Sequence, residues 1–100
     1  MYIVVEFVEA VREHRASLRQ ALMVLARAIS DKKLGCLQFD VSLDEMDGGS
    51  FLLYQVYTSK AAYVANLELP EYGEHRLVAD GWTHTRRHLS YELICGTGMA

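Results

Sequence analysis

The sequence predicts an α+β protein with the element order strand, helix, strand, strand, helix, strand, and three observations support this prediction. Two strand-like segments, 36–43 and 51–57, flank a polar turn. A helical repeat of apolar residues runs from about residue 11 to residue 32, and an alternating segment lies near each end of the chain. With short connections and right-handed crossovers, this order gives a ferredoxin-like βαββαβ fold, in which helices cover one face of a four-stranded antiparallel sheet.

The first half of the chain contains one strand and the longest helix. The strand is expected at residues 2–9, and because both of its faces carry apolar residues, we expect each face to be at least partly covered. Lys32 and Lys33 fall in the last helical turn, where cations complement the helix dipole, and Gly35 is a plausible stop. Four apolar residues at spacings of three and four give the helix a single buried face: Leu18, Leu22, Leu25 and Ile29.

The central hairpin is expected to divide its two faces between a pocket and an interface. Gly48 and Gly49 are predicted to supply positive φ angles where the backbone reverses. One face is apolar and includes Phe39 and Tyr54, which predicts the floor of a pocket beneath the helices. The other face mixes apolar and polar residues, which suits contact with another protein chain, and its polar members are Gln38, Asp40 and Gln55.

The second half of the chain is expected to hold two short helices and the last strand. Ser59 is a good N-cap for a helix over about residues 60–69, and Pro70 ends or restarts that helix. A second short helix is expected over about residues 71–82. The last strand begins at residue 86 or 87 and continues to residue 94 by its alternation.

The length of 100 residues predicts a single domain over residues 1–95 with a flexible tail at residues 96–100. The net charge of −3 and the absence of a basic patch with interleaved aromatics argue against nucleic-acid binding. No apolar run approaches the ~20 residues that span a bilayer, and no basic segment precedes the first strand, so neither a membrane span nor a signal peptide is expected. Cys36 and Cys95 lack metal-binding spacing, and we interpret them as reduced thiols in a cytoplasmic protein.

Three segments of the chain resemble the antibiotic biosynthesis monooxygenase (ABM) domain, and the resemblance extends over residues 2–94. These segments are the hairpin arms at 35–41 and 51–57 and the region 60–72 around Pro70. The resemblance implies a dimeric α+β barrel. The mixed apolar character of the uncovered sheet face independently predicts a homodimer that packs sheet to sheet with two-fold symmetry.

Three polar positions differ from those of many family members. The family often has a glutamate where this chain has Gln55, and histidines where it has Asn66 and Glu71. Glutamine keeps the hydrogen bonds of glutamate but cannot ionise, and asparagine can orient an oxyanion but cannot be a base. Glu71 could act as a base if it were partly buried, because burial raises the pKa of a carboxyl group.

A cleft between the sheet and the second helical region is the candidate site, because ligand sites are typically apolar pockets with a few polar groups. Glu71 and His75 are four residues apart on one predicted helix, so they can form a base and its orienting partner, or simply pair at the surface. For the aromatic residues the alternative is ordinary core packing, and no metal site is expected. The candidate catalytic residues are Asn66, Glu71 and His75, and the candidate substrate-binding residues are Phe7, Phe39, Tyr54, Tyr72 and Trp82.

The resemblance implies a cofactor-independent monooxygenase that oxidises a quinol-like or polycyclic aromatic small molecule with O2. Polar groups such as Asn66, Tyr72 or His75 would stabilise the developing oxyanion. Two alternatives remain open, an isomerase on the same scaffold and a non-enzymatic dimeric protein that binds a small molecule. Dependence on oxygen separates the first two activities, and tight binding without turnover identifies the third.

Overall fold

The computed structural model describes residues 1–97 and confirms the predicted order of elements. The first half of the chain forms β1 (Tyr2–Ala10), a 3-10 turn η1 (Arg12–His14), α1 (Arg15–Lys32), β2 (Cys36–Leu43) and β3 (Ser50–Tyr57). The second half forms α2 (Lys60–Leu67), α3 (Pro70–Ala79), a 3-10 turn η2 (Asp80–Trp82) and β4 (Thr83–Glu92). The helix predicted over residues 71–82 therefore begins at the proline and ends in a separate 3-10 turn.

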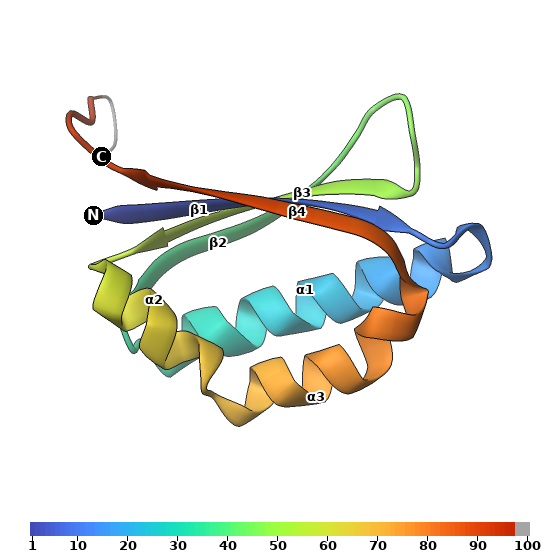
Figure 1. Ribbon diagram of the computed structural model, residues 1–100, viewed down its shortest axis with the longest axis horizontal. Helices are drawn as coiled ribbons and strands as arrows, with labels where there is room; N and C mark the ends of the chain where they lie inside the picture. Colours follow the sequence, from blue (N-terminus) through green and yellow to red (C-terminus); the bar gives the residue numbers. More distant parts are fainter. Residues whose placement is uncertain (98–100) are drawn as a thin grey trace.

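The four strands form one antiparallel sheet in the order β2-β3-β1-β4. All three helices lie on the same face of this sheet and the opposite face is bare, as predicted (Figure 1). The central strand β1 pairs with β3 on one side and with β4 on the other, so that Glu6 lies opposite both Leu53 and His88. The pairing of β1 with β4 joins the two ends of the chain.

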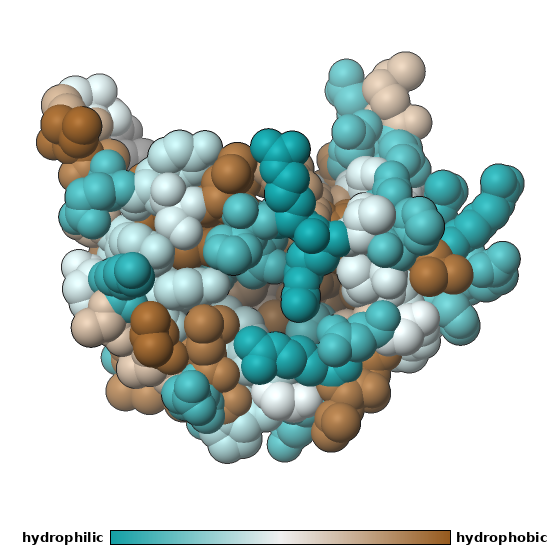
Figure 2. All heavy atoms as spheres, in the orientation of Figure 1, coloured by the Kyte–Doolittle hydropathy of each residue, from teal (hydrophilic) through white to brown (hydrophobic). Residues whose placement is uncertain are grey.

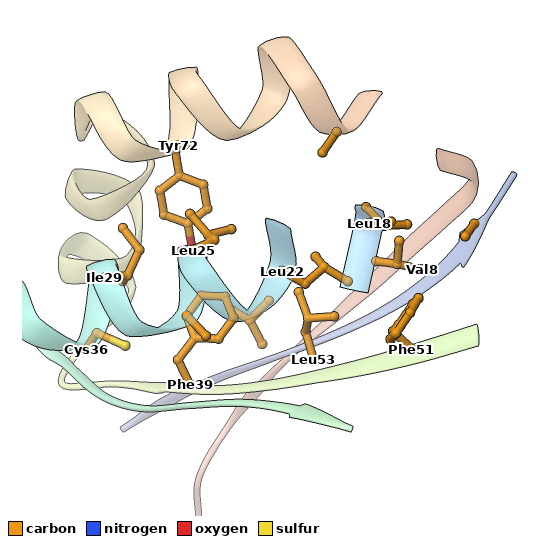
Figure 3. Packing of buried hydrophobic residues seen from close by; sticks show 14 of the residues in the cluster. Val8, Leu18, Leu22, Leu25, Ile29, Cys36, Phe39, Phe51, Leu53 and Tyr72 are labelled. Carbon is orange, nitrogen blue, oxygen red and sulfur yellow. The ribbon is translucent and has the colours of Figure 1, made fainter. Parts of the chain in front are cut away.

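The core lies between the sheet and α1, and it confirms the predicted helical face. Leu18, Leu22, Leu25 and Ile29 are all buried, and they pack against side chains that rise from the sheet (Figure 3). The residues beneath them come from three strands: Val4, Val8, Phe39, Phe51 and Leu53. Burying a side chain of this size contributes roughly 1.5–3 kcal/mol, so this layer supplies most of the driving force for folding.

Local capping explains where the helices begin and end. Ser59 caps α2 as predicted, because its Oγ accepts a hydrogen bond from the backbone N–H of Ala62 at 3.1 Å. Pro70 begins α3, since a proline at the first helical position has no N–H to leave unpaired. Gly35 follows α1 with φ at +93°, and a Cβ on it would lie 2.7 Å from the Cβ of Ala62. A glycine is therefore required where α2 packs against this turn.

The turn between β2 and β3 is closed by aspartate side chains, and the prediction of positive φ at Gly48 and Gly49 is wrong. Asp47 accepts hydrogen bonds from the Gly49 N–H at 3.0 Å and from the Ser50 hydroxyl at 2.8 Å. These hydrogen bonds lower the pKa of Asp47, with the backbone N–H of Gly49 as the largest cause. A Cβ at position 49 would lie 2.5 Å from Nε of Arg15, so a larger residue there would displace the Arg15 side chain.

The assignment of hairpin residues to the two faces was wrong for Gln55 and Tyr54. Gln55 is fully buried on the helix-covered face, whereas Tyr54 pairs with Val5 and lies on the bare face. A β-bulge in β2 lies between Cys36 and Gln38 and changes the phase of that strand. Cys36 and Phe39 consequently share the covered face although they are three residues apart.

The bare face carries several apolar side chains that no element of the single chain covers. Phe7 of β1 is 46% exposed and Tyr91 of β4 is 51% exposed, whereas Ile3 and Val5 on the same face are half-buried, so β1 is only partly covered on this side in a single chain. Gln38 and Asp40 lie on this face, as predicted, and the Gln38 amide donates to Asp40 at 2.6 Å.

The last strand begins at Thr83, earlier than predicted, and ends at Glu92. Of the tail predicted at residues 96–100, positions 98–100 lie outside the described residues. No helix in the described part of the chain has both the length and the apolar character needed to cross a membrane.

Candidate functional site

A cavity of about 210 Å³ lies between the covered face of the sheet and α3, close to β4. Its inner wall is apolar and is formed mainly by core residues of α1 and the sheet. Its polar groups come from five elements: Glu6 of β1, Tyr63 of α2, Tyr72, His75 and Arg76 of α3, Asp80 of η2, and Thr83, Arg86 and His88 of β4. Figure 2, which views this side of the molecule, shows hydrophilic residues gathered where β4 faces α3.

Four polar side chains form a hydrogen-bonded chain that ends in this cavity. The hydroxyl of Tyr57 donates to Oε1 of Gln55 at 2.6 Å, and the amide of Gln55 donates to Oε1 of Glu6 at 3.2 Å. The hydroxyls of Tyr57 and Tyr72 are 3.2 Å apart. The Tyr72 hydroxyl also lies 3.5 Å from Oε1 of Gln55, so either hydroxyl can be the donor in the contact between the two tyrosines. The chain therefore runs from Tyr72 through Tyr57 and Gln55 to Glu6.

Burial shifts the pKa values of three groups in or beside the cavity, Tyr57, Tyr72 and His75. It raises the pKa values of Tyr57 and Tyr72 well above the usual range, so both hydroxyls remain protonated hydrogen-bond donors. Burial also lowers the pKa of His75, and the nearby Arg86 adds to this shift. The imidazole of His75 is therefore neutral at pH 7 and can both donate and accept a hydrogen bond.

Tyr72 and His75 are the two predicted site residues that line the cavity. Figure 3 shows the Tyr72 ring pointing from α3 toward the sheet. Phe39 is on the covered face as predicted, but it is packed in the core beneath α1. Phe7 and Tyr54 lie on the opposite side of the sheet and do not line the cavity.

Asn66 connects α2 to the loop that follows α1. Its side chain is 1% exposed, and its Nδ2 donates to the carbonyl oxygens of Leu34 and Ala62, each at 2.8 Å. Its Oδ1 is buried and has no hydrogen-bond partner among the described residues. Asn66 does not line the cavity, so its amide fixes the position of α2 from outside.

Glu71 forms an ion pair between the start of α3 and the end of α1. Its Oε2 lies 2.7 Å from Nζ of Lys32, and this hydrogen bond lowers the pKa of Glu71. The shift is opposite in sign to the rise expected from burial. Within residues 1–97, no hydrogen bond joins Glu71 to His75. Both residues, together with Trp82, line a separate and more apolar groove of about 620 Å³ between α1 and α3.

The charged residues of the cavity were missed by the reading of the sequence. A detectable signal was present for Glu6, because it stands between Val4 and Val8 on a face that is otherwise buried. Arg86 and His88 gave no such signal. Their position depends on the pairing of β4 with β1, which links opposite ends of the chain.

Comparisons with known proteins agree with this architecture. The profile of the family described as "Antibiotic biosynthesis monooxygenase" matches residues 1–76. Candidate antibiotic biosynthesis monooxygenases of known structure are similar to the chain. The one from Deinococcus radiodurans has 27% identity and a TM-score of 0.88, and the match covers 100% of this chain and 99% of that one.

Two further structures share the fold at lower identity. The candidate antibiotic biosynthesis monooxygenase from Nitrosomonas europaea has 19% identity and a TM-score of 0.88, with 95% of this chain and 100% of that one covered. The one from Chloroflexus aurantiacus has 21% identity and a TM-score of 0.83, with 99% and 98% covered. A comparison with curated proteins gives no significant match.

Proposed function

The chain belongs to the antibiotic biosynthesis monooxygenase family, and from this premise we propose that it oxidises a small quinol-like aromatic molecule with O2. The observation that carries the proposal is the cavity between the sheet and α3, which combines an apolar wall with ionisable groups. Such a combination is typical of small-molecule sites, in which apolar contact binds the ligand and a few polar groups orient it.

The size of the cavity favours a substrate with a single aromatic ring. A protein cavity of roughly 150 Å³ can hold one benzene molecule, and this cavity has about 210 Å³. Pockets for larger ligands typically start at about 300 Å³. A substituted hydroquinone therefore fits better than a polycyclic substrate.

The reaction that we propose uses electrons from the substrate. Loss of a hydroxyl proton makes the ring electron-rich, and a ring carbon then forms a bond to one atom of O2. The O–O bond breaks, one oxygen stays on the ring, and the other leaves as water with two hydrogens from the substrate. One hydroquinone and one O2 thus give one hydroxyquinone and one water, with all four electrons supplied by the substrate.

The residues of the cavity have defined parts in this proposal. When the substrate is bound, Tyr72 turns its single hydroxyl proton toward a substrate oxygen and the neutral His75 forms a hydrogen bond with the substrate. Arg76 and Arg86 stabilise the negative charge that develops on the ring. Neither guanidinium has a carboxylate within 4.0 Å among the described residues, so both charges remain free for a ligand. Asn66 and Glu71, which lie outside the cavity, would act by fixing α2 and α3.

An isomerase is the second candidate, and one observation favours it. Glu6 and His88 lie opposite each other on β1 and β4, and both line the cavity. A carboxylate and an imidazole that line the same cavity can remove a proton from one carbon and return it to another without oxygen. Turnover under argon would identify this reaction, and binding without any turnover would identify a binding protein.

We also propose that the bare sheet face packs on a second copy of the chain. Half-exposed aromatic rings on that face support this proposal, because isolated proteins rarely leave such rings uncovered. A symmetric dimer is the usual way for one surface to cover itself. The cavity is on the other side of the sheet and would remain open to a ligand.

Oxygen uptake provides the test of the proposed reaction. The purified protein would be incubated with a panel of methyl-substituted hydroquinones under air, and the product would be analysed by mass spectrometry after reaction with 18O2. We expect one labelled oxygen atom in the product and faster oxygen uptake than in protein-free buffer. Uptake no faster than the spontaneous oxidation of the hydroquinone would contradict the proposal.

A matched pair of variants locates the reaction in the cavity. Tyr72→Phe removes a hydroxyl that reaches the cavity, so we expect it to lower the rate by about tenfold or more, in line with other lost oxyanion donors. Tyr91→Phe makes the same chemical change on the bare face and should leave the rate unchanged. Equal rates for the two variants would place the chemistry elsewhere.

A further inference from the structure

Glu6 is a charged residue at a position where the strand pattern calls for an apolar one. It lies on the covered face of β1 between Val4 and Val8, which are both buried. A carboxylate is costly to bury unless it is paired, so its presence beneath the helices needs a reason. Glu6 opens onto the cavity, which gives it access to a ligand.

Gln55 holds one of the two oxygens of Glu6. Its amide donates to Oε1 of Glu6 at 3.2 Å, and its own Oε1 accepts from Tyr57 at 2.6 Å. The donation from Tyr57 fixes which end of the amide faces Glu6, because a buried tyrosine hydroxyl needs an acceptor. A glutamate at position 55 could not make the same contact, since an ionised carboxylate has no proton to donate.

The other oxygen of Glu6, Oε2, is not used by Gln55. Oε2 accepts no hydrogen bond from the residues that the structure describes, and it is not closed off from the cavity. His88 lies directly opposite on β4, where the Cβ atoms of paired residues are about 4.5–5.5 Å apart. One carboxylate oxygen of Glu6 is therefore held by Gln55, and the other can accept a hydrogen bond or a proton from a ligand.

We propose that Glu6 is the base that removes the substrate's hydroxyl proton, and that Gln55 is the residue that positions it. This inference rests on the proposed binding of a quinol-like substrate in the cavity. The proton moves from the substrate oxygen to Oε2 of Glu6, and the electron pair of the O–H bond stays on the substrate as an oxyanion. Arg76 and Arg86 stabilise that anion, which makes the transfer to a carboxylate favourable.

The titratable and charged groups that line the cavity together with Glu6 come from α2, from α3 with η2, and from β4. They are Tyr63 of α2, Tyr72, His75, Arg76 and Asp80 around α3, and Arg86 and His88 of β4. The buried hydroxyls stay protonated, as their raised pKa values require, so they do not compete as bases. The neutral His75 could compete, which makes it the necessary comparison in the test.

The first test compares Glu6→Gln with Glu9→Gln. Both residues are on β1, but Glu9 lies on the opposite face and is exposed. For Glu6→Gln we expect kcat to fall by about 10²-fold or more while KM changes by less than about threefold, as for the loss of a general base. Glu9→Gln should match the wild type. Activity of Glu6→Gln within threefold of the wild type, or a larger loss in His75→Gln, would overturn the assignment.

Gln55→Glu tests the positioning role through pH. Two carboxylates that share one proton raise the apparent pKa of the pair. Since the base must be deprotonated, activity rises with pH through that pKa, and the rise should move to higher pH in the variant. A profile with an unshifted acidic limb would overturn the role of Gln55. Circular dichroism would verify that each variant is folded.

A binding measurement separates this inference from the proposed oxidation. Under argon, the carboxyl 13C signal of Glu6, assigned by its loss in Glu6→Gln, is followed while resorcinol is added to the wild-type protein. We expect the signal to shift as resorcinol saturates the protein. If the signal shifts but the hydroquinone panel gives no oxygen uptake, the role of Glu6 as the base is supported and the proposed monooxygenase reaction is contradicted. A signal that does not move overturns the role of Glu6, whatever the oxygen uptake.

Discussion

The two faces of the sheet each contain residues that are unusual for their environment: polar side chains lie under the helices, and aromatic rings lie on the bare face. The helix-covered face holds a hydrogen-bonded chain that includes Tyr57, Gln55 and Glu6, whereas the bare face carries half-exposed rings such as Phe7 and Tyr91. Polar groups under the helices are tolerated because each satisfies another. Apolar groups on the bare face are explained if a second chain covers them. The comparison teaches that the covered face combines an apolar core with a polar chain beside the cavity, whereas the bare face carries apolar rings that a single chain leaves uncovered.

The largest expected effect comes from neighbouring leucines of β3 that point to opposite faces. Leu53 is almost fully buried under α1, and Leu52 is partly exposed on the bare face. Leu53→Ala should reduce the free energy of unfolding by about 2–5 kcal/mol because it leaves a cavity. Leu52→Ala should cost a monomer roughly 1 kcal/mol. Urea unfolding at low protein concentration measures both, and equal losses would show that the two faces are packed alike.

The next effect concerns association through the bare face. Phe7→Asp puts a charge among the exposed rings, and we expect it to weaken the dimer by about 2 kcal/mol or more, roughly a 30-fold increase in Kd. Leu77→Asp is the control, since Leu77 is an exposed apolar residue on α3, away from that face. Sedimentation velocity measures both. A wild-type protein that remains monomeric at micromolar concentration would rule the interface out.

The smallest effect compares two tyrosine hydroxyls of β3. Tyr57 donates a hydrogen bond to Oε1 of Gln55 inside the protein. Tyr57→Phe removes this bond from a buried acceptor and should reduce the free energy of unfolding by about 1–3 kcal/mol. Tyr54 is on the bare face, and Tyr54→Phe should change the free energy of unfolding by less than about 0.5 kcal/mol. Thermal unfolding of the two variants measures the difference. If Tyr57→Phe unfolds at the same temperature as the wild type, the buried polar chain is not needed for stability.

The fold could be predicted because its signals are local. The apolar repeat of α1, the Ser59 cap and the proline that starts α3 each act within a few residues. Together they specify the order of elements, and the order leaves few possible topologies. The family resemblance pointed to the same fold.

The site was predicted only in part, because its geometry depends on which face of the sheet each strand residue takes and on the pairing of strands that are far apart in the sequence. Alternation in a strand separates two faces but does not say which one the helices cover, and Gln55 and Tyr54 were therefore exchanged. The bulge near Leu37 cannot be seen in the spacing of β2. Arg86 and His88 reach the cavity through the register between β4 and β1, which no local pattern contains.

The pairing of the first strand with the last has a consequence for how the protein is made. Glu6 is synthesised well before His88, and the two face each other only when β4 has docked on β1. Contacts between residues so distant in sequence form late, because closing a long loop costs entropy before it brings any gain. A nascent chain that has emerged as far as α3 can already assemble the layer between α1 and the first three strands. The cavity beside α3 lacks its β4 wall, including Arg86 and His88, until that strand has docked.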